Sequence, residues 1–367
     1  FEPTKEMIFS QLSSIGANYS FESWVKSRFG KTMYDTYFKP YTEKVWGLPP
    51  DQLDPRTASS RISFDSVFDL LYKTLKHYIT RKDDFSTIHN PLKNSFYYAK
   101  GGIGKICERL YKEGIKLGVK FNFNHEVKEL VKKNSSVIKI KFSNGKNISN
   151  FDYVINTIPL TVLTKSLGHN YEYPLRFRAM ILGFFSFDKP KLSDYHWIYT
   201  PSKELCFTRV TEFGQLKGAG MVPGGKTCIC LEIPCFKEDK IWYMQDKEAI
   251  EMMRKDLIKM RLITKNDKFN ATIVKQEYEY PLQVIGFLEM VKEIVEKSIK
   301  PIHNLVTIGR QGLYKYCNMN ECMEMALDVV EQIENNTKSF NYNFGSKWKG
   351  AGLDEERVLK EEFKNIS

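Results

Sequence analysis

Residues 38–61 read FKPYTEKVWGLPPDQLDPRTASSR, and this segment restricts the fold more than any other part of the chain. Aromatic residues, prolines and charges stand where a plain amphipathic helix would repeat apolar residues every three or four positions. Pro40 is expected to end the helix that residues 21–38 predict, because proline lacks the N–H that a helix interior needs. The Pro-Pro pair at 49–50 predicts an extended turn. We therefore expect Trp46 to be displayed at a bend; the alternative is a tryptophan that fills the core beneath a loop.

The composition is that of a globular chain. Its 367 residues, 42% of them hydrophobic, are enough for two domains with sizeable cores. The longest apolar candidate, residues 179–187, is too short to cross a membrane and is expected to be a buried strand. No membrane span is therefore predicted.

The cysteines and the charges indicate the cellular compartment and the kinds of binding partner. Seven cysteines, an odd number with no C-x-x-C, indicate reduced thiols in a cytoplasmic protein. The net charge of +11 comes from lysines scattered along the chain, so no nucleic-acid partner is predicted. A smaller share of the charge could form an anion pocket if arginines from distant segments meet. The histidines form no pair at metal-ligand spacing, so no metal site is predicted.

The first part of the chain is expected to be helical and the middle rich in strands. Apolar spacing predicts helices at 21–38 and 64–78, and a short aromatic strand running into a glycine turn at 94–104. A helix at 105–117 follows. A β-meander is then predicted from the β-rich runs 119–123, 126–132, 137–142 and 153–157, with a hairpin turn at Asn144-Gly145.

The second half is expected to be β-rich from 176 to 233, with an amphipathic helix at 245–261. The apolar run 305–308 then ends in Gly309-Arg310, before a helix at 318–332. Strand, glycine turn and helix together form an anion-binding geometry, because free backbone N–H groups at a helix start point at the ligand. The residues after Asn335 are expected to be weakly ordered.

The glycine cluster at 101–104 has two interpretations. Gly101-Gly102-Ile103-Gly104 could belong to a dinucleotide fingerprint, but the spacing is incomplete, and a tight turn that starts a helix is the simpler interpretation. No complete G-x-G-x-x-G occurs in the sequence, although a Rossmann-type flavoprotein carries that element at its N-terminus. We therefore expect the sequence to begin inside a longer protein.

Residues 20–335, roughly, resemble the UDP-galactopyranose mutase-like branch of the FAD-dependent amine oxidase and protoporphyrinogen oxidase superfamily, with the segments in the family's order. The resemblance implies a mixed α/β fold, in which a partial Rossmann-like FAD-binding domain is interleaved with a substrate domain of helices and antiparallel sheet. The implied domains are 1–93 (helical part of the substrate domain), 94–160 and 301–335 (FAD-binding), 161–300 (β-rich substrate domain) and 336–367 (tail).

The same resemblance implies the residues that bind FAD. The strongest match is Gly309-Arg310-Gln311-Gly312 followed by Asn318-Met319, which resembles the C-terminal flavin motif. Many bacterial mutases have Asp where this chain has Asn318, and this departure bears on substrate choice. The implied cofactor-binding residues are Gly101, Gly102, Val127, Thr157, Gly309, Arg310, Asn318 and Met319.

A sugar nucleotide is implied as substrate by a narrower set of residues. Arginine offers a rigid fork of donors that suits a diphosphate, and tyrosine hydroxyls add further donors. In WIYTPSKELCFTR, Tyr199 precedes Arg209 in the mutase spacing. The implied catalytic residues are Arg61, Arg209 and Tyr316, and the implied substrate-binding residues are Trp46, Tyr97, Tyr199 and Tyr280.

The resemblance implies an enzyme that interconverts the pyranose and furanose forms of a UDP-sugar for cell-surface polysaccharide synthesis, without net redox change. The alternative is an FAD-dependent oxidoreductase of the amine oxidase or protoporphyrinogen oxidase type, with an apolar substrate pocket. A third class is a non-catalytic scaffold, because the fingerprint element is missing. A small-molecule substrate is expected in the first two cases, and a homo-oligomer is a further expectation.

Overall fold

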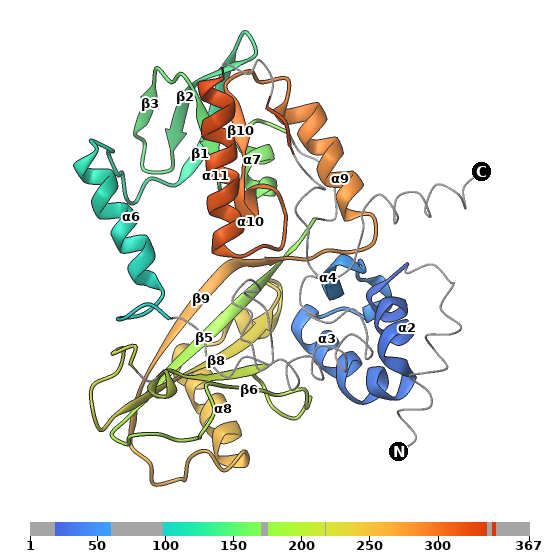
Figure 1. The fold of residues 1–367 in the computed structure, drawn as a ribbon, viewed down its shortest axis with the longest axis vertical. Helices are drawn as coiled ribbons and strands as arrows, with labels where there is room; N and C mark the ends of the chain where they lie inside the picture. The colour runs from blue at the N-terminus through green and yellow to red at the C-terminus, as the bar shows by residue number, and fades with distance from the viewer. Residues whose placement is uncertain (1–18, 60–97, 170–174, 217, 336–339, 343–367) are drawn as a thin grey trace, which may run out of the picture.

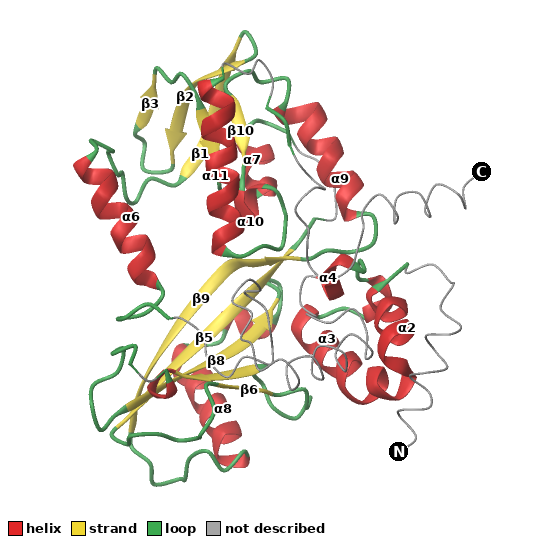
Figure 2. Ribbon diagram, in the orientation of Figure 1, coloured by secondary structure: helices red, strands yellow, loops and turns green. Residues whose placement is uncertain are grey.

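The computed structural model describes residues 19–59, 98–169, 175–216, 218–335 and 340–342. Two long strands, β5 and β9, run diagonally through the molecule and connect the sheets and helices drawn above them with those drawn below (Figure 1). Helices and antiparallel strands are mixed throughout the described part of the chain (Figure 2). The expected mixed α/β class is therefore confirmed.

The N-terminal helices pass through Pro40 without ending. Helix α2 (Phe21–Met33) continues through a π-helical turn (Tyr34–Phe38) into α3 (Lys39–Trp46), and Pro40 lies in the first turn of α3. Proline is tolerated in a first turn, where its missing N–H costs little. The expectation that Pro40 ends the helix was wrong, because the wider π-helical turn restarts the helix just before it.

Trp46 is buried. Gly47 ends α3 in the left-handed conformation with φ 70°, and the 3₁₀ turn Pro50–Gln52 and α4 (Arg56–Ser59) follow. Only 2% of Trp46 is exposed, since it packs into a core with Phe21, Trp24 and Leu53. The prediction of a tryptophan displayed at the bend was therefore wrong, and the core alternative is correct.

The predicted meander forms in part. Helix α6 (Gly104–Lys116) precedes the antiparallel strands β1 (Val127–Lys133), β2 (Ser136–Phe142) and β3 (Asn147–Ser149). The hairpin turn is confirmed, with Gly145 at φ 83°. The run 119–123 is not a strand, because its Phe121 packs on Tyr111 of α6 with ring centroids 4.5 Å apart.

The last predicted strand of the meander belongs to another sheet. Strand β4 (Val154–Asn156) pairs in parallel with β10 (Leu305–Thr307), which is distant in sequence. Helices α7 (Leu160–Ser166) and α9 (Phe287–Ile294) lie around the core under this pair. The apolar pattern predicted the strand, but it could not predict its distant partner.

A five-stranded antiparallel sheet forms the β-rich half. Its order is β6 (Trp197–Tyr199), β7 (Arg209–Glu212), β8 (Thr227–Cys235), β5 (Phe177–Phe187) and β9 (Phe269–Pro281). Helix α8 (Asp246–Lys259) covers one face, where Met253 and Leu257 share a core with Ile181 and Leu231. The predicted strand at 179–187 and helix at 245–261 are confirmed.

The C-terminal elements follow the predicted order of strand, glycine turn and helix. The short helix α10 (Gly309–Gly312) follows β10, and α11 (Met319–Glu334) comes next. None of the described helices is long and apolar enough to cross a membrane. The predicted helix at 64–78 and most of the tail after Asn335 lie outside the described residues.

Candidate functional site

The carboxyl ends of β4 and β10 meet at one edge of their two-stranded sheet. Asn156 and Thr307 are paired in register at the last position of each strand. Thr157 follows the first strand and Gly309 the second, so the parallel pairing brings these two predicted cofactor residues to the same edge. Ligands of open parallel sheets bind outside the carboxyl ends of the strands. This edge is therefore the candidate cofactor site.

A buried polar network fixes the turn after β10. The Asn156 side-chain amide donates to the Thr307 hydroxyl at 2.9 Å, and that hydroxyl donates to the backbone oxygen of Gly312 at 2.8 Å. Neither Asn156 nor Thr307 was among the predicted site residues. The available signal was a polar residue at the end of each apolar strand.

We expect Thr307→Val to lower the free energy of unfolding by about 1–3 kcal/mol, because it keeps the volume but removes both hydrogen bonds of a fully buried hydroxyl. Urea unfolding checks this value. Thr272→Val, at an exposed position of β9, is the control and should stay within about 0.5 kcal/mol of the parent. Equal stabilities of the two variants would contradict this role of Thr307.

Gly309 shapes the turn after β10, and its backbone N–H donates to Met325 Sδ at 3.4 Å. Its φ of 83° is unfavourable for other residues, and a Cβ placed on it would meet no atom within 4 Å. The next side chain, Arg310, donates from Nε and Nη2 to the backbone oxygen of Cys317, at 2.9 and 2.7 Å. Arg310 is therefore held at the turn by the segment that precedes α11.

An aromatic cluster surrounds Arg310. The rings of Tyr280 and Tyr316 lie 5.5 Å apart between centroids, and Trp46 lies 5.9 Å from Tyr280 and 6.5 Å from Tyr316. The Arg310 guanidinium lies 5.4 and 5.2 Å from the centroids of Tyr280 and Tyr316, a cation–π geometry. Arg310 Nη1 also lies 3.8 Å from a Glu279 carboxylate oxygen. The structure thus brings together two predicted substrate-binding residues, Trp46 and Tyr280, with the predicted catalytic residue Tyr316 and the predicted cofactor residue Arg310.

Arg209 lies on β7, between its cross-strand neighbours Tyr199 on β6 and Glu232 on β8. Its Nε and Nη2 donate to Glu232 Oε1 at 2.8 and 2.5 Å. Burial lowers the pKa of the Arg209 guanidinium, but the Glu232 carboxylate, with smaller contributions from Tyr280 and Tyr199, raises that pKa above its usual value. Arg209 is therefore charged, oriented and paired.

Glu232 was missed by sequence reasoning. It is the one charged residue in the strand TCICLEIPC, and a lone charge in an apolar strand was the signal that could have found it.

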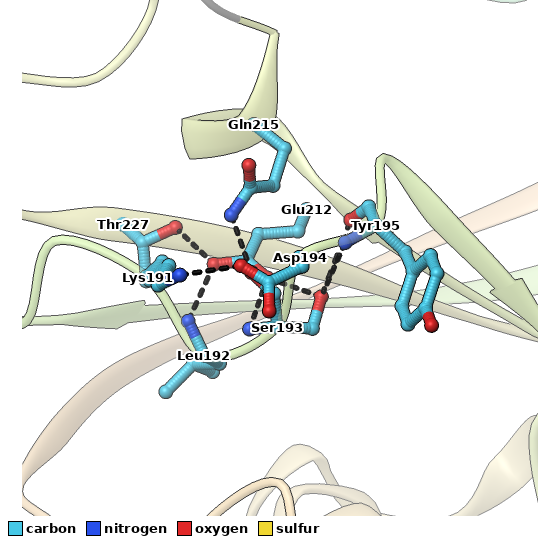
Figure 3. A network of polar contacts seen from close by, with 8 residues as sticks. All are labelled: Lys191, Leu192, Ser193, Asp194, Tyr195, Glu212, Gln215 and Thr227. Carbon is cyan, nitrogen blue, oxygen red and sulfur yellow. Dashed lines mark hydrogen bonds and ion pairs between the residues drawn. The ribbon is translucent and has the colours of Figure 1, made fainter.

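Glu212, at the end of β7, anchors the hairpin that carries Tyr199 and Arg209. Its side chain accepts hydrogen bonds from the backbone N–H groups of Leu192 and Ser193 at 2.7 and 2.9 Å. It also accepts from the hydroxyls of Ser193 and Thr227, at 2.8 and 2.9 Å (Figure 3). Only 2% of Glu212 is exposed. Three of these bonds fix the loop before β6 against the strand that positions Arg209, and the fourth ties that strand to the start of β8.

Lys44 connects α3 to the same hairpin. Its ammonium donates to the backbone oxygens of Thr200, Ser202 and Phe207, at 2.8, 2.8 and 2.6 Å. Burial lowers the pKa of Lys44 to about 8. This contact places the helix that contains Trp46 beside the strands that contain Tyr199 and Arg209.

The remaining predicted residues are more dispersed. Gly101 and Gly102 lie at φ 84° and 100° in a turn just before α6, which agrees with the tight-turn interpretation. Val127 begins β1. Asn318 is the N-cap of α11, where its N–H donates to Glu321, and Met319 is the first residue of that helix. Arg61 and Tyr97 lie outside the described residues.

A cavity of about 370 Å³ adjoins the turn that follows β10. Thr307 and Ile308 line one side, and Met325 and Asp328 of α11 line the other. No group of His, Cys, Asp and Glu within the described ranges could hold a metal ion.

The comparisons identify the class of protein. The model of the flavin-containing amine oxidoreductase family matches residues 11–262, and the chain therefore belongs to this family. The family implies FAD as the cofactor. No curated protein matches the sequence.

Solved structures with a similar fold include reduced UDP-galactopyranose mutase, with a TM-score of 0.71, 17% identity, and coverage of 97% of this chain and 75% of the mutase. A protein assigned as a protoporphyrinogen oxidase, from Exiguobacterium, gives a TM-score of 0.66 at 15% identity, over 92% of this chain and 72% of that one. An oxidoreductase from Methanosarcina mazei gives a TM-score of 0.51 at 15% identity, over 85% and 67%. At these identities the comparisons show a shared fold.

Proposed function

We propose that the protein is an FAD-dependent enzyme of the UDP-galactopyranose mutase type, which interconverts the pyranose and furanose forms of a UDP-sugar. One observation carries this proposal. Tyr280 lies 5.5 Å from Tyr316 and 5.9 Å from Trp46 between ring centroids, so predicted site residues from separate segments converge.

Each of these residues has a role in the proposal. Arg209 contributes a fixed positive charge toward the diphosphate as UDP departs, and Tyr199 and Tyr280 add hydroxyl donors beside it. Tyr316 faces the sugar from the segment before α11. Trp46 is buried, and its proposed role is therefore to pack against Tyr280 and Tyr316 and hold their rings in place. Arg61 and Tyr97 remain proposed contacts.

The residues at the carboxyl edge fit part of an FAD molecule, because no atom lies within 4 Å of where a Cβ of Gly309 would be and Thr157 follows the neighbouring strand β4. Thr157, Gly309 and Arg310 would hold the cofactor there, with Gly101, Gly102, Val127, Asn318 and Met319 as further proposed contacts. Bound in its reduced form, FAD supplies the nucleophile for the exchange at the anomeric carbon. The chain's own residues bind, orient and neutralise the substrate.

Charge balance favours a second candidate, an FAD-dependent oxidoreductase of the amine oxidase or protoporphyrinogen oxidase type. Glu232 is paired with Arg209, and Glu279 lies beside Arg310, so carboxylates offset both arginines of the described site. A neutral site suits a substrate without a diphosphate. Steady oxygen consumption with an amine or a porphyrinogen would support this candidate.

The test is a titration with UDP. Purified full chain, loaded with FAD and reduced with dithionite, is titrated while the flavin absorbance is recorded. The proposal predicts a saturable spectral change with UDP and none with uridine, because Arg209 needs the diphosphate. A flavin absorbance spectrum that does not change when UDP is added would support the oxidoreductase instead.

A further inference from the structure

Two cysteines lie in contact beside the candidate site. Cys317 Sγ and Cys322 Sγ are 3.6 Å apart, at the start of α11. Cys317 is buried, whereas Cys322 is partly accessible. Both are free thiols, and nothing in the proposed function uses them.

The start of α11 explains why they meet. Asn318 is the N-cap, and its N–H donates to the side chain of Glu321 three residues later, at 2.7 Å. Cys317 and Cys322 then occupy the positions just before the cap and four residues into the helix. Apolar residues at these two positions normally pack on each other. Here the packing pair carries two oxidisable sulfur atoms instead.

The surroundings make the two thiols unequal. The hydrogen bond with Cys317 lowers the pKa of Cys322, the charge of Arg310 lowers it further, and burial and Glu321 raise it in part. The same hydrogen bond and burial raise the pKa of Cys317. A thiolate near a helix N-terminus is the usual form of a reactive cysteine. Cys322 is therefore the attacking nucleophile of the pair, and Cys317 is the resolving cysteine.

We propose that Cys317 and Cys322 form an oxidisable dithiol site that closes to a disulfide on reaction with a peroxide. The Cys322 thiolate attacks one oxygen of hydrogen peroxide, the O–O bond breaks, and hydroxide leaves as a sulfenic acid forms. Cys317 then attacks the Cys322 sulfur, the S–O bond breaks, and water leaves. The two thiols lose two electrons in all, and the peroxide is reduced to water.

Closure of this disulfide acts on the candidate site through Arg310. The guanidinium of Arg310 is held by the backbone oxygen of Cys317. A covalent bond across the first turn of α11 therefore fixes the segment to which Arg310 is attached. The disulfide would restrain the backbone of this turn, and it would form only when peroxide is present.

The experiment uses the reduced full chain, treated with an equimolar amount of hydrogen peroxide and then with N-ethylmaleimide. Digestion with a protease that cuts after glutamate separates the two cysteines at Glu321, so their fragments stay joined only by a disulfide. We expect joined fragments that carry no maleimide and that separate with dithiothreitol. Separate fragments, each carrying maleimide, would overturn the proposal.

Variants and a rate measurement distinguish this site from simple packing. In Cys317→Ser, Cys322 should accumulate a sulfenic acid that dimedone traps, whereas Cys107→Ser should form the joined fragments like the parent. At about pH 6.5, iodoacetamide should label Cys322 roughly tenfold faster than the exposed Cys107. Equal labelling rates, or no sulfenic acid in Cys317→Ser, would show that the pair only packs.

Discussion

Arg209→Ala is expected to lower kcat/KM for a UDP-sugar by about 30- to 900-fold while FAD stays bound. The reason is electrostatic: Arg209 supplies the fixed charge next to the departing diphosphate, and one such contact is worth about 2–4 kcal/mol in the transition state. Each factor of ten in rate corresponds to about 1.36 kcal/mol. Turnover and bound flavin absorbance are measured on the same preparation.

The controls separate chemistry from folding. Arg209→Ala leaves the Glu232 carboxylate without this partner, so Arg209→Lys, which keeps a charge, is measured beside it. Lysine lacks the planar fork of arginine and should recover only part of the activity. Arg254→Ala, on α8 with its own Glu251 partner, should turn over like the parent. Parent-like turnover in Arg209→Ala would remove Arg209 from the mechanism.

Glu212→Ala is expected to lower the free energy of unfolding by about 3–5 kcal/mol, because a buried network is broken. The change leaves the backbone N–H groups of Leu192 and Ser193 and the Thr227 hydroxyl without their shared acceptor. It also loosens the hairpin that holds Arg209. Denaturant unfolding gives the size of the loss.

Two further variants serve as controls for the loss of stability in Glu212→Ala. Glu212→Gln keeps the size of the side chain but replaces one acceptor oxygen by a donor, so a smaller loss of stability than in Glu212→Ala is expected. Glu334→Ala, at an exposed position in the last turn of α11, should stay within about 0.5 kcal/mol of the parent. If Glu212→Ala matches Glu334→Ala, the network does not hold the hairpin.

Elements with a strong local signal were predictable from the sequence. The Asn144-Gly145 turn supplied the left-handed backbone of a hairpin, and it forms as expected. Residues 179–187 form part of β5, because a bounded apolar run of this length suits a buried strand. These predictions needed only neighbouring residues, and they were correct.

Elements that depend on distant contacts were not predictable. Pro40 continues the helix because a π-helical turn precedes it, and nothing local signals that turn. Residues 119–123 have strand-like composition, but their aromatic rings pack on α6 instead of pairing in a sheet. Strand β4 was predicted, yet its partner β10 lies far along the chain.

The residues of the candidate site were likewise predictable only in part. The tyrosines at 280 and 316 came from the family resemblance, and the structure brings them together. Glu232, Glu212 and Lys44 were missed, because each acts through a partner on another segment of the chain. Single residues with a family pattern were predictable, whereas the contacts that orient them needed the fold.

The reaction proposed for this flavin-family chain is the isomerisation of a sugar nucleotide. The most direct measurement incubates the FAD-loaded, dithionite-reduced protein with UDP-galactopyranose and separates the sugar nucleotides by chromatography. We expect conversion to UDP-galactofuranose that continues over many turnovers without consuming reductant. No furanose product, together with steady oxygen consumption by the oxidised protein with an amine or a porphyrinogen, would contradict it.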